Sequence, residues 1–468
     1  MAESSSSNKL QKLETKIQDR ISDLPDCVLT RILSFLPTKI SVQTSILSSR
    51  WQHLWQHLSV LDFKDDSHYY HYHHSERFKS FAVMVNGVLN LLRNPRGIKK
   101  MTLECAYVVS HDQFRRVSVD TWVRSVIGPY LEELNLTLNE DDQGSYFKLP
   151  QTLFTSHNLV SLSLAGGISV RVLSSTTVRL PSLKKMIINI GLVEVPSLNA
   201  LLYGCPIIEV LDLHFRPVCF DKVCVPPSLK RLRIGTKTDV GASLEIDAPD
   251  LECLIVRKIT FGNVFSMYNL HNVAAAYLDV FARSTGSVIS LHDLLNALSG
   301  IKHLMLSRST TKLLLGEPPD LLFGEFRYLI HLDLKFPWFN SNSLLSLLHK
   351  CPLLQVLIIQ NVKFKEQRPI LGCAPQPSVP NCLVSHLNFI QFKGCQGYED
   401  ELFFIEYVLQ NGLVLETMNV ADISLDLQTK YDLLKRLFNV RKACEMCQFT
   451  FDTAVYPKKQ LCLLKYPK

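Results

Sequence analysis

Leucine and other aliphatic residues recur along most of the chain at the spacing L-x-x-L-x-L. The last two apolar positions of each unit are separated by a single residue that is usually not a leucine. This alternation predicts a short strand with one buried face. Each unit is therefore expected to contribute a strand followed by a helical or irregular return. The clearest copies are Leu131-Leu134-Leu136, Leu159-Leu162-Leu164, Ile208-Leu211-Leu213, Leu229-Leu232-Ile234, Leu251-Leu254-Val256, Ile301-Leu304-Leu306, Leu329-Leu332-Leu334 and Leu354-Leu357-Ile359.

Successive copies begin about 21 to 33 residues apart, with weaker ones at Ile98, Leu183, Val273 and Leu387. This period is typical of leucine-rich repeats, in which stacked units bury apolar side chains that no single unit could bury. The pattern predicts a solenoid, an α/β horseshoe, over residues 96–374. A chain of 468 residues is too long for one ordinary core, which also favours a repeat array.

A different pattern occupies residues 19–58, before the repeats. Apolar residues there follow helical spacing and predict three short amphipathic helices. A segment of about 40 residues buries too little surface to be securely stable alone. Two interpretations remain open. The helices form an ordinary three-helix core, or they display an apolar patch that another protein covers, made of Leu24, Pro25, Ile32, Leu33, Leu36 and Trp51.

Four pieces of this segment resemble an F-box, the module that docks the adaptor of cullin-based ubiquitin ligases. They are ISDLP at 21–25, ILSFLPTK at 32–39, VQTSILS at 42–48 and RWQHLW at 50–55. Cys27, Ile40 and Gln43 depart from the residues common in that family. The resemblance implies that residues 19–63 bind a Skp-family adaptor and, through it, a cullin. The expected adaptor contacts are Leu24, Pro25, Leu29, Ile32, Leu33, Leu36, Pro37, Val42, Leu47, Trp51 and Trp55.

The carboxy-terminal segment begins at a Pro-rich break, APQP at 374–377. A helix is expected after the acidic run at 399–401, because acidic residues favour a helix N-terminus. A second helix over 431–440 and a strand over 447–451 follow. Segment 375–452 resembles the FBD domain that closes many plant F-box/leucine-rich-repeat proteins, and it would cap the last repeats. The resemblance rests mainly on Cys382-Leu383, Phe392-Lys393-Gly394, Tyr407-Val408-Leu409 and Cys447-Gln448-Phe449.

Residues between the repeated leucines should project from the inner face of the horseshoe. Arg231, Arg233 and Arg257 fall there on consecutive repeats, and we expect them to meet an acidic segment of a target protein. The competing interpretation is that these are solvated strand residues without a ligand. A small-molecule receptor using this face is a third interpretation, but no residue pattern supports a cofactor.

The remaining segments carry weaker signals. Residues 1–18 are polar and expected to be disordered, residues 64–95 to form a linker, and residues 453–468 a tail. The linker contains the run HYYHYHH at 68–74, which could bind a metal but is interpreted as a polar tether. Cys444 and Cys447 form a lone C-x-x-C, too few ligands for a structural zinc, so no metal site is predicted.

Composition and motifs argue against several functions. The net charge of +7 is modest and spread along the chain, so we expect no nucleic-acid binding. No stretch approaches the 18 apolar residues of a membrane helix, and residues 1–10 lack a secretory signal. The 13 cysteines show no paired spacing, which favours reduced thiols in the nucleus and/or cytoplasm. No nucleotide-binding or hydrolase motif occurs, so we expect no catalytic residue.

The sequence thus predicts an α+β protein: a three-helix F-box, a leucine-rich-repeat solenoid and an FBD cap. The expected function is substrate recognition in a Skp–cullin–F-box ubiquitin ligase. The protein would hold a target near the transfer machinery and make no covalent bond itself. Two rival functions stay open: an adaptor-bound scaffold that delivers no target, and an enzyme with an unrecognised site on the repeats.

Overall fold

The computed structural model describes residues 21, 23–65, 74–106, 113–139, 146–173, 177–217, 223–236, 242–281, 285–315, 324–361, 378–421 and 425–451. Several predictions fall on residues outside these ranges. They are the disorder of residues 1–18, most of the histidine-rich run, the Pro-rich break and the carboxy-terminal tail.

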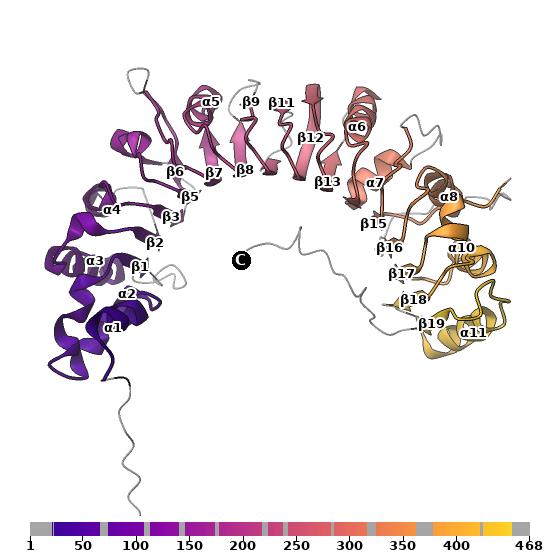
Figure 1. Ribbon diagram of the computed structural model, residues 1–468, viewed down its shortest axis with the longest axis horizontal. Coiled ribbons are helices and arrows are strands. Elements are labelled where there is room, and N and C mark those ends of the chain that lie inside the picture. Colours follow the sequence, from indigo (N-terminus) through magenta and orange to yellow (C-terminus); the bar gives the residue numbers. More distant parts are fainter. Residues whose placement is uncertain are drawn as a thin grey trace, which may run out of the picture.

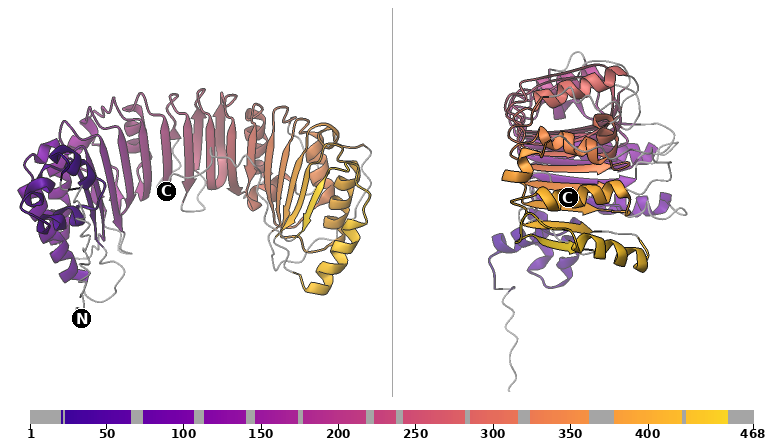
Figure 2. Two further views of the ribbon diagram at one scale, coloured as in Figure 1. Left: turned by 60° about the horizontal axis from the view of Figure 1, so that its bottom comes forward. Right: turned by 90° about the vertical axis from the view of Figure 1, so that its right-hand side faces the viewer.

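A curved parallel sheet dominates the structure, with its strands on the inner side of an arc and most helices on the outer side (Figures 1 and 2). Each strand pairs in parallel with the next one along the arc. The strands of this inner sheet are β1 (Val60–Lys64), β2 (Lys100–Ala106), β3 (Glu133–Asn139), β5 (Ser161–Gly166), β7 (Lys185–Val193), β8 (Val210–Pro217), β10 (Arg231–Thr236), β12 (Cys253–Tyr268), β13 (Ala275–Phe281), β14 (His303–Leu306), β15 (His331–Phe336), β16 (Val356–Asn361), β17 (Phe389–Lys393), β18 (Thr417–Ala421) and β19 (Gln448–Phe451).

The repeated leucines form the core of the solenoid, as their spacing predicts. On β8, Leu211 and Leu213 are fully buried, and Asp212 between them points to the opposite, inner face because side chains alternate along a strand. Leu211 is in register with Leu232 on β10, which is in register with Leu254 on β12. Stacking in register therefore gives one continuous apolar core, and the predicted horseshoe is confirmed.

The outer layer changes from helices to strands and back along the arc. Its helices are α3 (His74–Leu91), α4 (Gln113–Val126), α5 (Val195–Tyr203), α6 (Thr285–Ala297), α7 (Arg308–Leu314) and α8 (Ser341–His349). Between α5 and α6, short strands β9 (Val223–Cys224) and β11 (Ala242–Asp247) pair with each other, and β11 pairs with the second half of β12. Lys258, at φ 50°, lies where the register of β12 shifts between Val256 and Ile259.

The expectation of a linker over residues 64–95 is wrong for most of that range. Helix α3 packs into the core, where Phe78, Ala82 and Val85 are completely buried. Trp122 of α4 stacks near Phe78, with ring centroids 5.9 Å apart, and donates a 2.7 Å hydrogen bond from its indole to Asn86. The helical spacing of these apolar residues carried the signal, but the adjoining histidine-rich run led to the linker interpretation.

The FBD segment continues the solenoid instead of forming a separate domain. Strands β17, β18 and β19 extend the inner sheet, while α9 (Asn381–Ser385), α10 (Glu399–Asn411) and α11 (Leu427–Phe438) cover it. The expected helices and strand are present. Gly394, from the FBD sequence motif, has φ 75°, and a Cβ there would lie 2.1 Å from the carbonyl oxygen of Asn361. Only glycine fits this approach between neighbouring repeats.

Two carboxylates, one of them fully buried, join α10 to the preceding repeats. Glu401 is fully buried, and its Oε2 accepts hydrogen bonds from the backbone N–H groups of Gln396 at 2.8 Å and Tyr398 at 3.1 Å. The side-chain amide of Asn361, on β16, donates to its other oxygen. Asp400 accepts from the backbone N–H of Ser341, at the start of α8. These bonds compensate the cost of burying charge and join the FBD segment to the repeats.

Candidate functional site

Short helices precede the first strand and form the candidate docking module. They are α1 (Asp26–Leu33), α2 (Thr38–Gln43), and the 3₁₀ segments η1 (Thr44–Ile46) and η2 (Trp51–His57). Pro25 and Pro37 occupy the positions just before α1 and α2, where a proline is tolerated because no intrahelical N–H bond is required. The third predicted helix is thus a 3₁₀ helix, which is tighter than the α-helix that its spacing suggested.

Four of the expected adaptor contacts lie in the core of the module. Leu29, Leu33, Trp51 and Trp55 are 0, 1, 7 and 6 % exposed, so they cannot contact another protein without a rearrangement of the helices. With Leu54 and Leu58 they form the three-helix core that was one of the two interpretations. Their contribution to docking in this structure is to hold the surrounding side chains in place.

The apolar patch of the other interpretation is present only in part, because Leu33 and Trp51 are buried, but a second set of apolar side chains remains uncovered. Phe35 is 75 % exposed, Ile46 86 % and Leu47 65 %. Val28, Ile32, Phe35 and Leu36 follow helical spacing, so they lie on one side of α1 and of the residues directly after it. Exposed apolar side chains gathered in this way mark an interaction site more often than ordinary surface does. We define the docking face as the set of exposed apolar residues Val28, Ile32, Phe35, Leu36, Ile40, Ile46 and Leu47.

Three expected contacts, Ile32, Leu36 and Leu47, belong to the docking face, and Pro25 and Pro37 are also exposed. Leu24 and Val42 are partly buried and pack against the core. Sequence reasoning did not select Val28, Phe35, Ile40 and Ile46 as contacts. On α1 the available signal was a second apolar stripe, in which Val28 and Ile32 are followed by Phe35 just after the helix, beside the stripe that includes Leu29 and Leu33.

Hydrogen bonds hold the module in a fixed position on the solenoid. The hydroxyl of Thr38 accepts a 2.7 Å bond from the backbone N–H of Asp62 on β1. The hydroxyl of Ser41 donates a 2.9 Å bond to the carbonyl of Leu33, which ties α2 to α1. Arg50 forms a 2.8 Å ion pair with Asp26 and also donates to the carbonyl of Leu24. The docking face is therefore oriented relative to the repeats.

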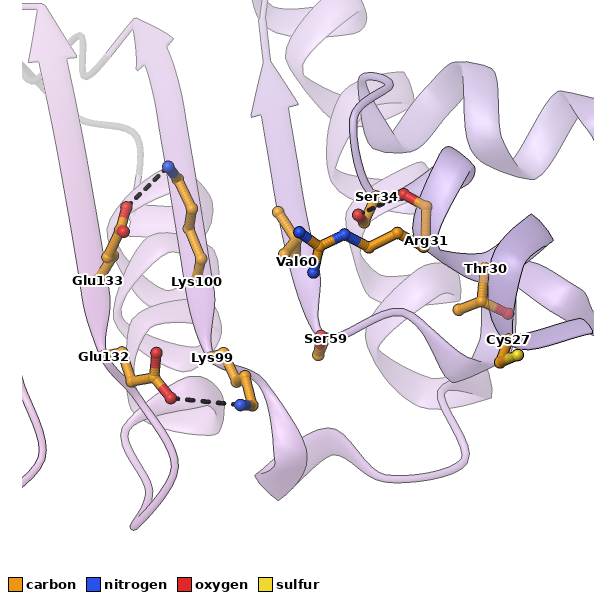
Figure 3. A pocket seen from close by; sticks show the side chains of 10 residues that line it. All are labelled: Cys27, Thr30, Arg31, Ser34, Ser59, Val60, Lys99, Lys100, Glu132 and Glu133. Carbon is orange, nitrogen blue, oxygen red and sulfur yellow. Dashed lines mark hydrogen bonds and ion pairs between the residues drawn. The ribbon is translucent and has the colours of Figure 1, made fainter.

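A cavity of about 350 Å³ lies where α1 meets the first strands (Figure 3). Four of its charged groups form two ion pairs: Lys99 Nζ lies 3.3 Å from Glu132 and Lys100 Nζ 2.7 Å from Glu133. Arg31 reaches across it from α1 toward Val60, as Figure 3 shows. Exposed, mutually neutralised pairs of this type contribute little to stability and do not form an acid–base site.

The structure brings together the three arginines that the sequence singled out on the inner face. Arg231 and Arg233 lie on β10, and Arg257 lies opposite Gly235 on the neighbouring strand β12. Arg233 forms a 2.9 Å ion pair with Asp212 of β8. The guanidinium of Arg257 lies 5.7 Å from the ring centre of Tyr277, within the range of a cation–π interaction.

The inner face beyond β13 is different, because several of its polar side chains are buried, among them His331, Asp333, Gln391 and Asn419. Burial lowers the pKa of His331 to about 4 and raises that of Asp333 to about 6. Gln360 donates to Asp333 at 3.0 Å, and on the next strands Gln391 donates to Asn419, which donates to Thr450. This polar ladder is hydrogen-bonded within the protein, as buried polar groups generally must be.

The described residues offer little for metal or covalent chemistry. No group of three or more His, Cys, Asp or Glu side chains within them is arranged to hold a metal ion. Burial raises the pKa of the Cys205 and Cys382 thiols to about 12, which suppresses the reactive thiolate. Within the same ranges, no helix has the length and apolar character needed to span a membrane.

Taken together, the fold and the site define a class: a leucine-rich-repeat solenoid that carries an N-terminal helical docking module. Comparisons with protein families identify its three parts. The F-box domain model matches residues 21–63, and the FBD model matches residues 375–420. A model described as the LRR repeats of FBD-associated F-box protein At5g56370 matches residues 119–283.

Relatives match nearly the whole chain. F-box/FBD/LRR-repeat protein At4g26340 of Arabidopsis thaliana is 31% identical over 446 residues, covering 93% of this chain and 100% of the relative. FBD-associated F-box protein At4g10400 from the same plant is 29% identical over 442 residues, covering 93% and 100%. F-box/LRR-repeat protein 13 is 26% identical over 429 residues, covering 86% and 89%. The chain belongs to the F-box/FBD/LRR-repeat family, which confirms the resemblance drawn from its motifs.

Proposed function

We propose that this protein is the substrate-recognition subunit of a Skp–cullin–F-box ubiquitin ligase. In this proposal the docking face binds a Skp-family adaptor, the adaptor connects to a cullin, and the inner face of the repeats holds a target protein. The observation that carries the proposal is the docking face: Phe35, Ile46 and Leu47 are more than half exposed, beside a module core in which Leu29 and Leu33 are buried. Family membership supports the same assignment.

The proposed contribution to ubiquitin transfer is positional. A target held on the repeats and an adaptor held on the docking face would be kept at a fixed separation, because Thr38 and Asp62 connect α2 to β1. Transfer to a lysine of the bound target then resembles an intramolecular reaction, in which proximity replaces a slow encounter. We propose that the subunit itself is non-catalytic and acts in the nucleus or the cytoplasm.

A trapping experiment tests this function. The full chain and the double variant Ile32→Asp/Phe35→Asp would be expressed in plant cells, and the captured proteins identified. Val83→Asp supplies a matched control, because Val83 is 72 % exposed on α3, outside the docking face. We expect the adaptor and cullin to be lost from the double variant only, while proteins bound to the repeats accumulate on it.

The captured proteins would then be tested for ubiquitin transfer in a reconstituted ligase. Transfer that requires the wild-type docking face supports the proposal. Adaptor binding without transfer to any captured protein would instead identify an adaptor-bound scaffold. Equal adaptor capture by the double variant and by Val83→Asp would contradict the docking assignment.

A further inference from the structure

Charged side chains on the inner face are balanced at the start of the arc. Lys64 on β1 is in register with Glu104 on β2, and their charged atoms lie 3.5 Å apart. Lys100 on β2 is in register with Glu133 on β3, at 2.7 Å. Each of these lysines therefore faces an acidic residue on the next strand, an arrangement that neutralises the surface.

In the middle of the arc, Arg231 lacks such an acidic neighbour. Arg231 on β10 is in register with Val210 on β8 and Cys253 on β12, both of which are uncharged. Arg231 is exposed, and it forms no ion pair or hydrogen bond with the part of the chain that the structure describes. Its positive charge is therefore available to a ligand.

Arg233 and Arg257 add to the positive charge beside it. Arg233 faces Ile255 on β12, so Arg257, two residues further along that strand, is its diagonal neighbour. Side chains in this relation are close enough to interact. Burial and the nearby charge of Arg233 both lower the pKa of Arg257, which means that the two guanidinium groups repel each other. Asp212 offsets part of this positive charge through its ion pair with Arg233, and Asp212 and Asp279 both attract Arg257 more weakly.

We propose that Arg231, Arg233 and Arg257 bind an acidic, extended peptide segment of the target protein. This inference rests on the proposed function, because it assumes that the repeats hold a target. Charge complementarity argues for the ligand: an anion between the guanidinium groups would relieve their repulsion and pair with Arg231. Carboxylate and phosphate groups share this chemistry.

The geometry also indicates how acidic residues should be spaced. Arg231 and Arg257 are offset by four residues along adjacent strands, which places their Cα atoms roughly 14 Å apart. Arg233 lies between them along the strand direction. An extended peptide with acidic residues at alternate positions presents its charges on one side at about 6.6 Å intervals, and can thus pair with the three arginines along its length.

Peptide binding to the purified full chain tests the proposal. The probes are a fluorescein-labelled peptide of alternating glutamate and serine, the same peptide with glutamine for glutamate, and a version in which one serine is phosphorylated. The variants are Arg231→Glu and Arg257→Gln. Arg327→Glu is the matched control, since Arg327 is exposed and paired with Glu325 outside the inner sheet. Thermal unfolding of each variant shows whether it is folded.

We expect the glutamate peptide to bind and the glutamine peptide not to bind. Arg231→Glu should weaken binding about five- to tenfold, with less than about twofold change for Arg327→Glu. Stronger binding of the phosphorylated peptide would also support the proposal and identify phosphate as the preferred anion. Equal binding of the glutamine peptide, or equal losses in Arg231→Glu and Arg327→Glu, would overturn it.

Adaptor binding by the same samples separates the two proposals. If the wild-type chain binds the adaptor but neither acidic peptide, the arginine assignment fails while the docking assignment stands. If the chain binds acidic peptide through Arg231 but no Skp-family adaptor, the proposed ligase function fails while the anion-binding surface stands.

Discussion

The two ends of the solenoid differ: the first exposes apolar side chains, and the last repeats bury polar side chains. The amino-terminal module leaves Phe35 and Ile46 largely exposed, whereas the carboxy-terminal repeats bury Glu401, Asn419 and other polar side chains. Exposed apolar area favours association with another surface. Buried polar groups that are satisfied within the chain indicate a finished interior. The first end thus leaves apolar side chains available to a partner, whereas the last repeats satisfy buried polar groups within the chain.

Glu401→Ala should reduce the stability of the last repeats more than any other substitution considered below. It removes the acceptor for the N–H groups of Gln396 and Tyr398 and leaves buried donors unsatisfied. We expect a loss of about 2 to 4 kcal/mol in the stability of the last repeats. Hydrogen exchange of α10 and β17 measures this locally. Glu399→Gln is the control, because Glu399 is exposed and only pairs with Arg436; an equal loss in both variants would contradict the role of the buried bonds.

The buried residues His331 and Asp333 on β15 should both make the stability of the protein depend on pH. Burial raises the pKa of Asp333 from 3.8 to about 6, so its stabilising contribution is lost as pH rises through that range. Burial, with His303 nearby, lowers the pKa of His331 from 6.5 to about 4, so its contribution is lost as pH falls through that range. The two trends oppose each other in the same window and largely cancel.

Single substitutions should expose each trend. Between pH 4 and 6.5, the free energy of unfolding of Asp333→Asn should rise more steeply with pH than that of the wild type, and that of His331→Gln less steeply. Each difference should reach up to about 3 kcal/mol. Denaturant unfolding at several pH values measures it. Parallel pH profiles for all three proteins would show that these side chains are solvated in the folded state.

Thr38→Val tests how the amino-terminal module is held on β1. The substitution removes the acceptor for the N–H of Asp62 and should cost about 1 to 2 kcal/mol, with loosening of the module on β1. Thr44→Val is the control, because its hydroxyl bonds only to Ser41 within the adjacent turn. Hydrogen exchange at β1 should increase for Thr38→Val alone. No difference between the two variants would mean that the module is held by packing.

The smallest effect is expected at the exposed side chains of α11. Tyr431 is 61 % exposed there, but it lies at the carboxy-terminal end of the arc, far along the sheet from α1 (Figure 1). Tyr431→Asp should therefore leave adaptor affinity unchanged within about twofold and change stability by less than about 0.5 kcal/mol. A large loss of adaptor affinity would place a second adaptor contact at the FBD end.

The repeats could be predicted from the sequence because their spacing directly reflects the period of the fold. Leu211, Leu213 and their equivalents occupy the core as that spacing requires. The outer strands β9 and β11 were not predicted. The two residues of β9 are too few to show a period, whereas ASLEID at 242–247 alternates between apolar and polar residues, a strand signal that the leucine spacing does not include. Helix α3 was missed where a histidine-rich run adjoined a genuine helical pattern.

The docking face was predicted only in part, for a physical reason. Short helices such as α1 carry apolar residues on two sides, and periodicity cannot tell which side faces inward. Tertiary packing placed Leu29 and Leu33 inside and left Ile32 and Phe35 outside. The arginine cluster was easier to anticipate, because residues between repeated leucines must share the inner face.

Adaptor affinity of the full chain tests the central claim most directly. A purified Skp-family adaptor would be titrated by calorimetry into the wild type, Phe35→Asp and Val83→Asp. Phe35 is 75 % exposed and Val83 72 %, so both variants place a charge at a similarly exposed apolar position. The account predicts at least about a thirtyfold loss for Phe35→Asp and less than about twofold for Val83→Asp. Equal affinities for all three proteins would contradict it.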